Sequence, residues 1–314
     1  MEKKHSPRIS IGLPVFNGEN YLKESLESIL SQKFSDFELI ISDSASTDRT
    51  PEICQEYAQK DKRIHYFRNK EKHGAAWNYN NVFKLSSGLY FKWAAHDDLH
   101  HPEHLLKCAQ VLDRDPSVVL CCSKIFNIDS HGNRIGIYDY RAQFDSKNPE
   151  ERFRDVLRKK PVFSLYGVIR RDVLKKSQLL ASYIGSDWTL LAELSLAGRF
   201  FEIPEFLFFR RTHDQAYTNK YYSKKIKIHD YRTEARWWTG NNKGPLIALP
   251  YWKIFVEFNN SIRRSSLSWK KKLACYDELG KWLFKGSGKS LLCGDLKNEL
   301  QLMRLKLNQS SQNN

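Results

Sequence analysis

The sequence predicts an α/β protein whose central sheet is mostly parallel and is flanked by helices. One observation is that short apolar runs, typical of buried strands, alternate with segments of helical apolar spacing over residues 8–122. Another is that polar clusters follow three of these strands, at Asn17, Asp43 and Asp97–Asp98. Because ligands of such sheets bind beyond the carboxyl ends of the strands, we expect the three clusters to border one crevice.

Each element is indicated by a local pattern. The apolar run at 8–15 stops at Phe16-Asn17-Gly18, and apolar residues at helical spacing follow it. Thr50-Pro51-Glu52 combines a capping hydroxyl, a proline at the first helical position and an early acid, which together indicate a helix start. The predicted strands cover residues 8–15, 37–42, 63–68, 89–95 and 118–122, and the predicted helices cover 19–32, 75–85, 102–112 and a segment that begins at Thr50.

Composition places a boundary near Thr218. The chain has 314 residues and a net charge of +15, and residues 220–314 carry 19 basic and 7 acidic side chains together with five of the eight tryptophans. We therefore expect a body at 1–218 and a basic, aromatic-rich helical C-terminal extension at 219–314. The N-terminus lacks the apolar stretch of a signal peptide, and no apolar run approaches the roughly 20 residues of a spanning helix. Six cysteines without a C-x-x-C pair also favour a cytoplasmic protein with reduced thiols.

The loop after the first strand excludes two common nucleotide sites. It reads P-V-F-N-G-E at 14–19, so it lacks the G-x-G-x-x-G of dinucleotide-binding folds, and no G-x-x-x-x-G-K-[ST] loop occurs in the chain. The crevice offers carboxylates instead. Asp43 is suited to accept hydrogen bonds from a base or ribose, and Asp97–Asp98 to hold a divalent cation that neutralises a diphosphate. Helix capping explains Asp48 but not Asp43, and a solvated turn is the alternative for Asp97–Asp98.

Four segments together resemble glycosyltransferase family 2. They are P-V-F-N-G-E-N-Y-L at 14–22, D-F-E-L-I-I-S-D-S-A-S-T-D at 36–48, H-G-A-A-W-N at 73–78 and W-A-A-H-D-D-L at 93–99. Each alone is weak, but all four occur in the family's order and spacing within a resemblance that covers roughly residues 7–215. The resemblance implies the GT-A (nucleotide-diphospho-sugar transferase) fold and an inverting transfer of a sugar from a nucleotide donor to an acceptor hydroxyl, with Mg²⁺ or Mn²⁺.

The resemblance also implies roles for individual residues. Phe16 stands where tyrosine is common, and Ala95 stands where many members have a first aspartate, which leaves open whether Asp97 or Asp98 takes the metal. The positions that match the donor site are Pro14, Phe16, Asn17 and Glu19 in the nucleotide loop, Asp43 at the base, Gly74 and Asn78 along the nucleotide pocket, His96 and Asp97 beside the donor, and Arg210 and Arg211 at the diphosphate. The expected metal ligands are Asp97, Asp98 and His213.

The expected general base is Asp187. Inversion by direct displacement needs one carboxylate that removes the proton of the acceptor hydroxyl, while the metal stabilises the leaving diphosphate. Asp187 precedes an apolar helix and matches the second acid of the family's E-D motif, with Ser186 in place of the first. The structural alternative is an acid that interacts with the helix dipole, and the two roles are compatible.

The expected partners follow from the resemblance and from charge. They are a nucleotide-sugar donor, for which a UDP-sugar is expected, and a glycan or lipid-linked acceptor. The basic extension has two open interpretations: a helical segment that packs on the body with a solvated basic outside, or a segment that docks on an anionic membrane, which would place the protein on the inner face. No nucleic-acid motif occurs, so nucleic acid is not an expected partner. The alternative function is a non-catalytic protein that binds sugar nucleotides or polyanions and retains the fold.

Overall fold

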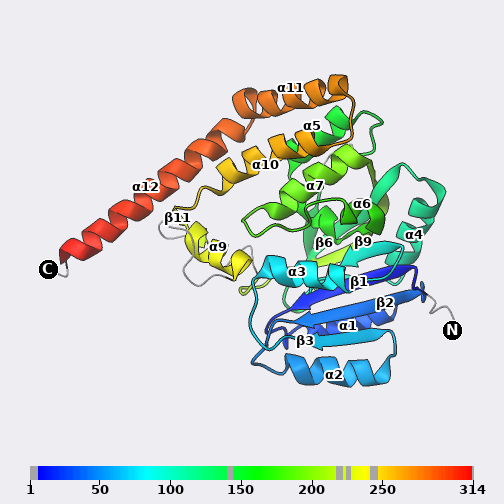
Figure 1. Cartoon of the computed structure of the whole chain (residues 1–314). Coiled ribbons are helices and arrows are strands. Elements are labelled where there is room, and N and C mark those ends of the chain that lie inside the picture. The colour runs from blue at the N-terminus through cyan, green and yellow to red at the C-terminus, as the bar shows by residue number, and fades with distance from the viewer. Residues whose placement is uncertain (1–5, 140–143, 217–221, 224–227, 241–246, 313–314) are drawn as a thin grey trace.

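The computed structural model describes residues 6–139, 144–216, 222–223, 228–240 and 247–312 (Figure 1). The large sheet is formed by β1 (Ile9–Val15), β2 (Phe37–Asp43), β3 (Ile64–Arg68), β4 (Tyr90–Trp93), β5 (Leu99–His100), β6 (Val118–Ile128), β7 (Arg134–Tyr138), β8 (Val168–Arg170) and β9 (Arg199–Arg211). A separate pair is formed by β10 (Tyr222–Ser223) and β11 (Ile228–His229). The α/β fold predicted from the sequence is confirmed.

The helices occur between the strands and then in succession after β11. They are α1 (Leu22–Leu30), α2 (Thr50–Lys60), α3 (Ala75–Lys84), α4 (His104–Arg114), α5 (Pro149–Lys159), the 3₁₀ helix η1 (Val162–Tyr166), α6 (Arg171–Lys175), α7 (Ser186–Ala197), α9 (Tyr231–Thr239), α10 (Pro250–Arg264), α11 (Trp269–Lys285) and α12 (Gly288–Gln312). The elements predicted over residues 8–122 all form, with ends that differ by a few residues; the largest difference is that β6 continues to Ile128.

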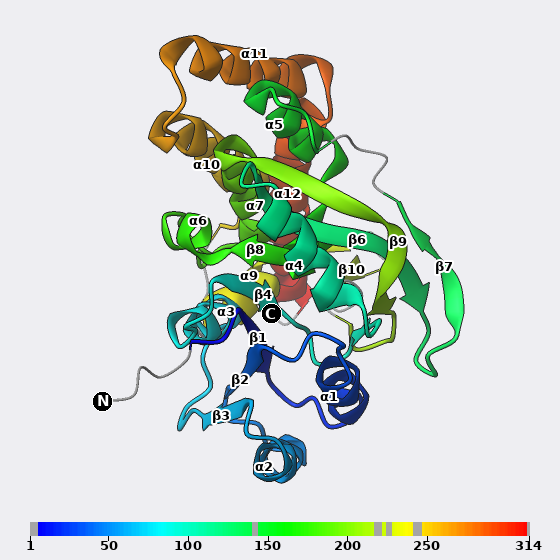
Figure 2. The same cartoon turned by 90° about the vertical axis from the view of Figure 1, so that its right-hand side faces the viewer.

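The sheet runs in the order β3-β2-β1-β4-β8-β6-β9-β5, with β7 paired to β6. The strands β3, β2, β1 and β4 are parallel, as are β6 and β9, whereas β8 is an antiparallel insertion between β4 and β6. Val15 at the end of β1 pairs with Asp43 at the end of β2. The polar residues that follow these two strands therefore lie at one edge of the sheet, as the crevice prediction requires. Figure 2 shows β1–β3 at one end of the molecule and β6 and β9 nearer the other.

Period-two alternation along the strands divides the core between the two faces of the sheet. Ile11 and Ile41 point into the core that contains buried residues of α1, α2 and α4, whereas Ile40 and Trp93 point into the core that contains α3, α7 and α10. Gly12 makes the second face close-packed: a Cβ there would lie 2.6 Å from Cγ2 of Val82 in α3. The absent side chain lets α3 lie directly on β1, which fixes the residues at the start of α3 beside the strand ends.

The C-terminal extension is helical, as predicted, and it shares the core of the body. Phe258 of α10 and Trp282 of α11 contact Trp188 of α7 in T-shaped arrangements, with centroid separations of 5.1 and 6.1 Å. All three rings are almost completely buried. The composition break near Thr218 therefore marks a change of surface character, while α10 and α11 pack on α5 and α7 as part of one core.

Asp295 in α12 caps the start of α10. Its Oδ2 accepts the backbone N–H groups of Tyr251 and Trp252 at 2.7 and 3.2 Å, and these are orphan donors of the first helical turn after Pro250. The Asp295 side chain is fully buried, and its Oδ1 has no hydrogen-bond partner. Burial raises the pKa of Asp295 from its usual value to about 6, against the opposing effect of the two N–H groups. A neutral acceptor would therefore serve this cap better than a carboxylate near neutral pH.

Asp295→Asn is accordingly expected to stabilise the protein near pH 8 and to have little effect near pH 4. The native state binds the Asp295 proton more tightly than the unfolded state does, so the wild-type free energy of unfolding falls as pH rises through the interval between the two pKa values. The variant lacks this loss. Its free energy of unfolding near pH 8 should therefore exceed that of the wild type by about 1–3 kcal/mol, at 1.36 kcal/mol per pKa unit. Thermal unfolding of the wild type and the variant at both pH values measures this difference, with the exposed Asp277→Asn as control. A stability difference between variant and wild type that is equal at both pH values would contradict the raised pKa of Asp295.

Candidate active site

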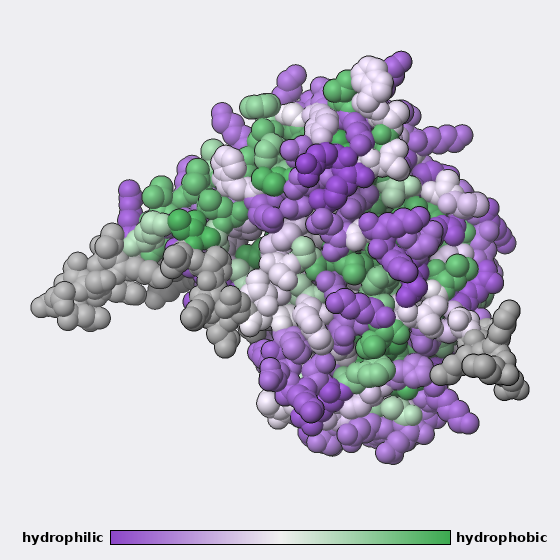
Figure 3. All heavy atoms as spheres, viewed as in Figure 1, coloured by the Kyte–Doolittle hydropathy of each residue, from purple (hydrophilic) through white to green (hydrophobic). Residues whose placement is uncertain are grey.

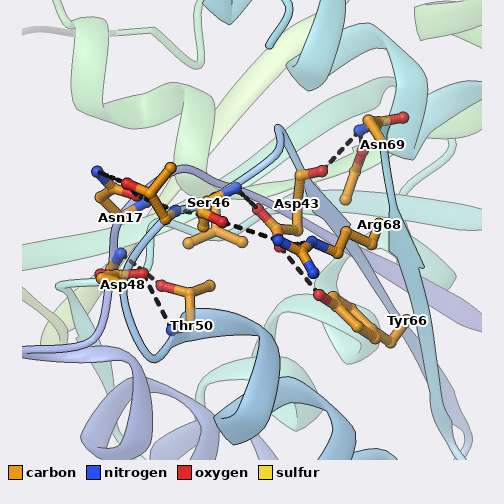
Figure 4. A network of polar contacts seen from close by, with 12 residues as sticks. Asn17, Asp43, Ser46, Asp48, Thr50, Tyr66, Arg68 and Asn69 are labelled. Carbon is orange, nitrogen blue, oxygen red and sulfur yellow. Dashed lines mark hydrogen bonds and ion pairs between the residues drawn. The ribbon is translucent and has the colours of Figure 1, made fainter. Parts of the chain in front are cut away.

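The loop after β1 is held by the loop after β2. Asn17 adopts a left-handed backbone conformation (φ 52°), which is uncommon for residues other than glycine. Its N–H donates to Oγ of Ser46 at 2.9 Å, and its Oδ1 accepts the N–H of Thr47 at 2.9 Å (Figure 4). The exposed Asn17 is therefore fixed by contacts from both its backbone and its side chain. Strained residues of this kind are typical of functional loops.

Two further contacts extend this arrangement. The N–H of Glu19 donates to Oδ2 of Asp48 at 3.0 Å, and a carboxylate oxygen of Glu19 accepts the N–H of Arg49 at 2.9 Å. Asp48 also accepts the N–H of Thr50, the first residue of α2, at 3.0 Å, whereas the hydroxyl of Thr50, predicted to cap this helix, accepts the N–H of Gly18 at 2.8 Å instead. Glu19 thus positions the two loops relative to each other, and this contact accounts for the acid without any ligand.

Asp43 is completely buried at the end of β2. Its Oδ1 accepts the N–H of Ser46 at 2.9 Å, its Oδ2 accepts the hydroxyl of Tyr66 at 2.9 Å, and the guanidinium of Arg68 lies 3.8 Å away (Figure 4). The carboxylate therefore holds the backbone of the loop at 44–49 in place from the protein interior. Tyr66 and Arg68 belong to β3, and no motif in the sequence singles them out.

Asn78 and Gly74 place α3 against these loops. The amide of the buried Asn78 donates to the carbonyl of Ser42 at 2.9 Å, and its own Oδ1 is buried without a partner. Gly74 is the residue before α3, and a Cβ there would lie 2.4 Å from the backbone nitrogen of Gly240, so the end of α9 lies directly on this position. Pro14 is buried within β1, opposite Ser42.

Phe16 is the aromatic side chain of the loop that follows β1. Its half-buried ring faces the ammonium of Lys72 at 3.9 Å, a cation–π distance. His73, which follows Lys72 in the sequence, stacks on Trp77 with ring centroids 3.8 Å apart, and Trp77 is exposed. These aromatic side chains form surfaces suited to a planar base.

Asp97 and His213 lie together although 116 residues separate them. Nε2 of His213 lies 3.0 Å from Oδ2 of Asp97, both side chains are mostly buried, and the His213 ring packs on Tyr21 with centroids 4.7 Å apart. Burial works against the charge of Asp97, but His96 and the hydrogen bond from His213 outweigh it, so the pKa of Asp97 lies below its usual range. His96 also lies against the nucleotide loop, since a Cβ on Gly18 would be 2.8 Å from its Cδ2.

Asp98 and Arg211 fasten β9 to the end of β4. Oδ1 of the buried Asp98 accepts the backbone N–H of Arg211 at 2.9 Å. Burial and the neighbouring charge of Asp97 raise the pKa of Asp98 well above its usual value. The pKa values of these two adjacent carboxylates are therefore shifted in opposite directions, that of Asp97 downward and that of Asp98 upward. Of the two, Asp97 is the better candidate for a cation ligand.

The structure gives Arg211 a packing role rather than the predicted contact with a diphosphate. Its side chain is completely buried, and all three guanidinium nitrogens are engaged: Nε by the carbonyl of Asp97 at 2.8 Å, Nη2 by Glu24 at 2.6 Å and Nη1 by the carbonyl of Ser130 at 3.1 Å. Consecutive strand residues point to opposite faces, so the chain turns Arg210 the other way. Arg210 is half-buried, and its guanidinium lies 4.3 Å from the ring of Phe163.

Asp187 begins α7 on the far side of the site. It is half-buried, and burial raises its pKa against the opposing charge of Lys160. Lys160 ends α5 in a left-handed conformation (φ 48°), and its ammonium lies 5.0 Å from the ring of Trp188. Sequence reasoning missed Lys160, because only the fold brings the end of α5 to the start of α7. A left-handed lysine has no signal in the sequence.

Tyr79 connects the two halves of the site. Its hydroxyl lies 3.1 Å from that of Tyr166, and its pKa is raised by burial and by the charges of Asp97, Asp98 and Asp187. All three carboxylates therefore lie within electrostatic range of one tyrosine. Asp43 lies beneath the loop that follows β2, where its Oδ1 accepts the N–H of Ser46.

No group of three or more His, Cys, Asp and Glu side chains in the described ranges could hold a metal ion by itself. The pair Asp97 and His213 supplies one carboxylate and one imidazole. An open depression of about 680 Å³ lies instead at the opposite edge of the sheet, lined by residues that include Arg8, Asp36 and Lys175. None of the predicted site residues lines it.

The family model described as glycosyl transferase family 2 matches residues 10–177. An uncharacterized glycosyltransferase of Rickettsia typhi is 34% identical over 133 residues, which is 41% of each chain. An uncharacterized glycosyltransferase of Methanocaldococcus jannaschii is 26% identical over 260 residues, 79% of this chain and 85% of that protein. The match thus spans about two fifths of the length of the Rickettsia typhi relative and most of the length of the archaeal one.

Solved structures show the same fold. S. aureus TarS 1–349 in complex with UDP-GlcNAc superposes with a TM-score of 0.62 and 16% identity, over 89% of this chain and 74% of that one. A mannosyltransferase from Pyrobaculum calidifontis in complex with GDP-Man and Mn²⁺ superposes with a TM-score of 0.53 and 15% identity, over 95% and 88%. At these identities the likeness concerns the fold.

Proposed function

Because this chain belongs to glycosyltransferase family 2, we propose that it transfers a sugar, with inversion, from a nucleotide-diphospho-sugar to a hydroxyl group of a glycan or lipid-linked acceptor. The observation that carries this proposal is the contact of Asp97 with His213 at 3.0 Å, which joins the segment after β4 to the segment after β9, together with the pairing of the ends of β1 and β2. The base and ribose of the donor lie against these loops and Phe16, and Asp187 lies on the acceptor side.

The metal fits the residues present. Mg²⁺ and Mn²⁺ are commonly bound by one or two carboxylates together with substrate phosphates. A cation that took the place of the proton shared by Oδ2 of Asp97 and Nε2 of His213 would be bound by one carboxylate oxygen and one imidazole nitrogen. A bound cation would stabilise the negative charge of the leaving diphosphate. Asp98 would support this site through its bond to the backbone of β9, and Arg210 is the remaining arginine candidate at the diphosphate.

Asp187 acts as the general base in this proposal. A base functions best when its pKa approaches the working pH, and burial moves the pKa of Asp187 in that direction. The charge of Lys160 opposes this upward shift, and the ionised carboxylate is the form that accepts the proton of the acceptor hydroxyl. Transfer of that proton to Asp187 as the sugar C1 is attacked from the opposite face accounts for inversion in a single step.

A UDP-sugar is the proposed donor, supported by a structural neighbour solved with UDP-GlcNAc. The neighbour solved with GDP-Man makes GDP-sugars the first alternative to test.

We further propose a cytoplasmic enzyme, since all six cysteines are free. In the described part of the chain, none of the helices has the length and apolarity needed to cross a bilayer.

Thermal-shift measurements with UDP-, GDP- and dTDP-sugars, each with Mn²⁺ and with EDTA, would identify the donor. Hydrolysis or transfer of that donor is then measured with and without Mn²⁺. Metal-dependent release of the nucleoside diphosphate supports the proposal. A donor that stabilises the protein while no product forms under any metal condition would instead favour the non-catalytic binding protein, for which Ser186 in place of a glutamate is the motivating observation.

A further inference from the structure

Helix α12 presents its polar side to the protein. Asp295 caps α10, Asn298 exchanges hydrogen bonds with the backbone of His229 at 3.0 and 3.1 Å, and Glu299 accepts from Arg232 at 2.5 Å and from the N–H of Ala248 at 3.1 Å. Asp295 and Glu299 are both buried. The polar contacts that attach α12 therefore come from residues at i, i+3 and i+4, on one side of the helix.

The flank of α12 next to this polar side is apolar and exposed. Leu296, Leu300 and Met303 are 45%, 56% and 39% exposed and recur at i, i+4 and i+7, so they form one stripe. Trp252 and Val256 of α10, 41% and 45% exposed, lie next to it, since Nε1 of Trp252 donates to the carbonyl of Leu292 in α12. Figure 3 shows hydrophobic side chains gathered over α12 and the adjoining part of α10. We call these five residues the docking face.

The charges around the docking face have one sign. Over residues 288–304 the basic side chains of α12 are Lys289, Lys297 and Arg304, and its two acids are the buried Asp295 and Glu299. The exposed surface of this part of α12 is thus basic and apolar, without a carboxylate. A helix with an apolar stripe, a tryptophan at its margin and flanking basic residues is suited to the interface of an anionic membrane.

We propose that the docking face binds the surface of a bilayer that contains anionic lipid. A second copy of the chain is a poorer occupant, because a two-fold interface would bring the same basic side chains of both copies together. Lysine and arginine side chains are attracted to an anionic leaflet, and the apolar stripe adds burial in the headgroup region. This combination explains why an inward-facing polar side and an outward-facing apolar side occur on one helix.

A series of contacts connects the docking face with Asp187, the proposed general base. Asp295 of α12 holds the N–H of Tyr251, and the ring of Tyr251 lies 5.6 Å from the ammonium of Lys160, which acts on Asp187. A membrane bound to α12 and α10 would therefore lie near the acceptor side. This step rests on the proposed function and deepens it: the acceptor hydroxyl belongs to a lipid-linked molecule presented at the membrane surface.

Flotation of the full chain with vesicles tests the proposal. Vesicles of phosphatidylcholine, with and without phosphatidylglycerol, are compared at low and high salt. We expect binding only to the anionic vesicles, weakened by salt, and reduced at least about tenfold in Leu296→Asp/Leu300→Asp, since both substitutions replace an exposed apolar side chain of the docking face with a negative charge. The matched control is Leu85→Asp/Leu89→Asp, two exposed leucines outside the docking face, which should bind as the wild type does.

Three results would overturn the proposal. The first is wild-type protein that does not float with the anionic vesicles at low salt, and the second is a control variant that loses as much binding as the test variant. The third is a dimer that forms without lipid as the protein concentration rises and that only Leu296→Asp/Leu300→Asp disrupts. Circular dichroism and thermal unfolding confirm that both variants fold. Donor hydrolysis in solution is measured alongside and should be unchanged in both. Its absence in every protein would remove the proposed function while leaving the vesicle result intact.

Discussion

Asp187→Asn is expected to reduce kcat for sugar transfer by about 10²–10⁴-fold, the usual contribution of a general base, while donor affinity changes little. Asparagine keeps the size of the side chain but cannot accept the proton of the acceptor hydroxyl. Steady-state kinetics with the donor identified above, together with a calorimetric titration of that donor, separate the two quantities.

Glu193→Gln is the matched control for Asp187. Glu193 lies on the same helix, burial likewise raises its pKa, and its carboxylate accepts the N–H of Gln178. Its replacement by the amide should leave kcat within a few-fold of wild type. In the wild type, transfer requires ionised Asp187, so the acid limb of the pH profile of kcat should lie above the usual aspartate pKa. This limb should be absent from the residual activity of Asp187→Asn. Near-normal turnover by Asp187→Asn would show that another group accepts the proton.

Asp97→Asn is expected to reduce transfer by about 100-fold or more at limiting Mn²⁺, because a bound cation supplies several kcal/mol of transition-state stabilisation. The amide preserves shape but removes the negative charge that pairs with His213. Raising the Mn²⁺ concentration should restore part of the lost activity. Transfer rates across a Mn²⁺ titration measure this directly.

The control for Asp97 is Asp172→Asn, an exposed acid beside the depression at the opposite edge of the sheet, which should leave the Mn²⁺ dependence unchanged. His213→Gln should move the half-saturating Mn²⁺ concentration upward without an equal loss of thermal stability. If Asp97→Asn kept the wild-type Mn²⁺ titration curve, Asp97 would not be the ligand, and the assignment of this pair would fail.

The parallel half of the fold could be read from the sequence because its signals are local. Apolar runs and helical spacing over residues 8–122 fix β1 to β4 and α1 to α4, and parallel pairing then brings the residues after β1 and β2 to one edge. The position of Asn17 beside the loop after Asp43 follows from that pairing. Asp48 could likewise be assigned to a cap from the residues near it.

The metal side could be predicted only in part. Arg210 and Arg211 are equivalent in the sequence, and the direction of each side chain depends on the register of β9 against β6 and β5. The structure turns Arg211 inward onto Asp97 and Glu24, which excludes it from the predicted role. Asp97 and Asp98 are also adjacent and alike, and their opposite pKa shifts arise from burial and from the partners each one meets.

The sequence by itself determined the α/β class, the loops that form the donor side and the unequal distribution of charge, since these depend on residues close together in the chain. Only the tertiary structure decided which acids meet, that Lys160 reaches the neighbourhood of Asp187, and that α12 turns its carboxylates inward while Leu296 and Leu300 stay exposed. Amphipathic spacing identifies the two sides of a helix but not which one faces the protein. That choice is made by contacts such as Asp295 with the start of α10, which involve residues more than 40 positions apart.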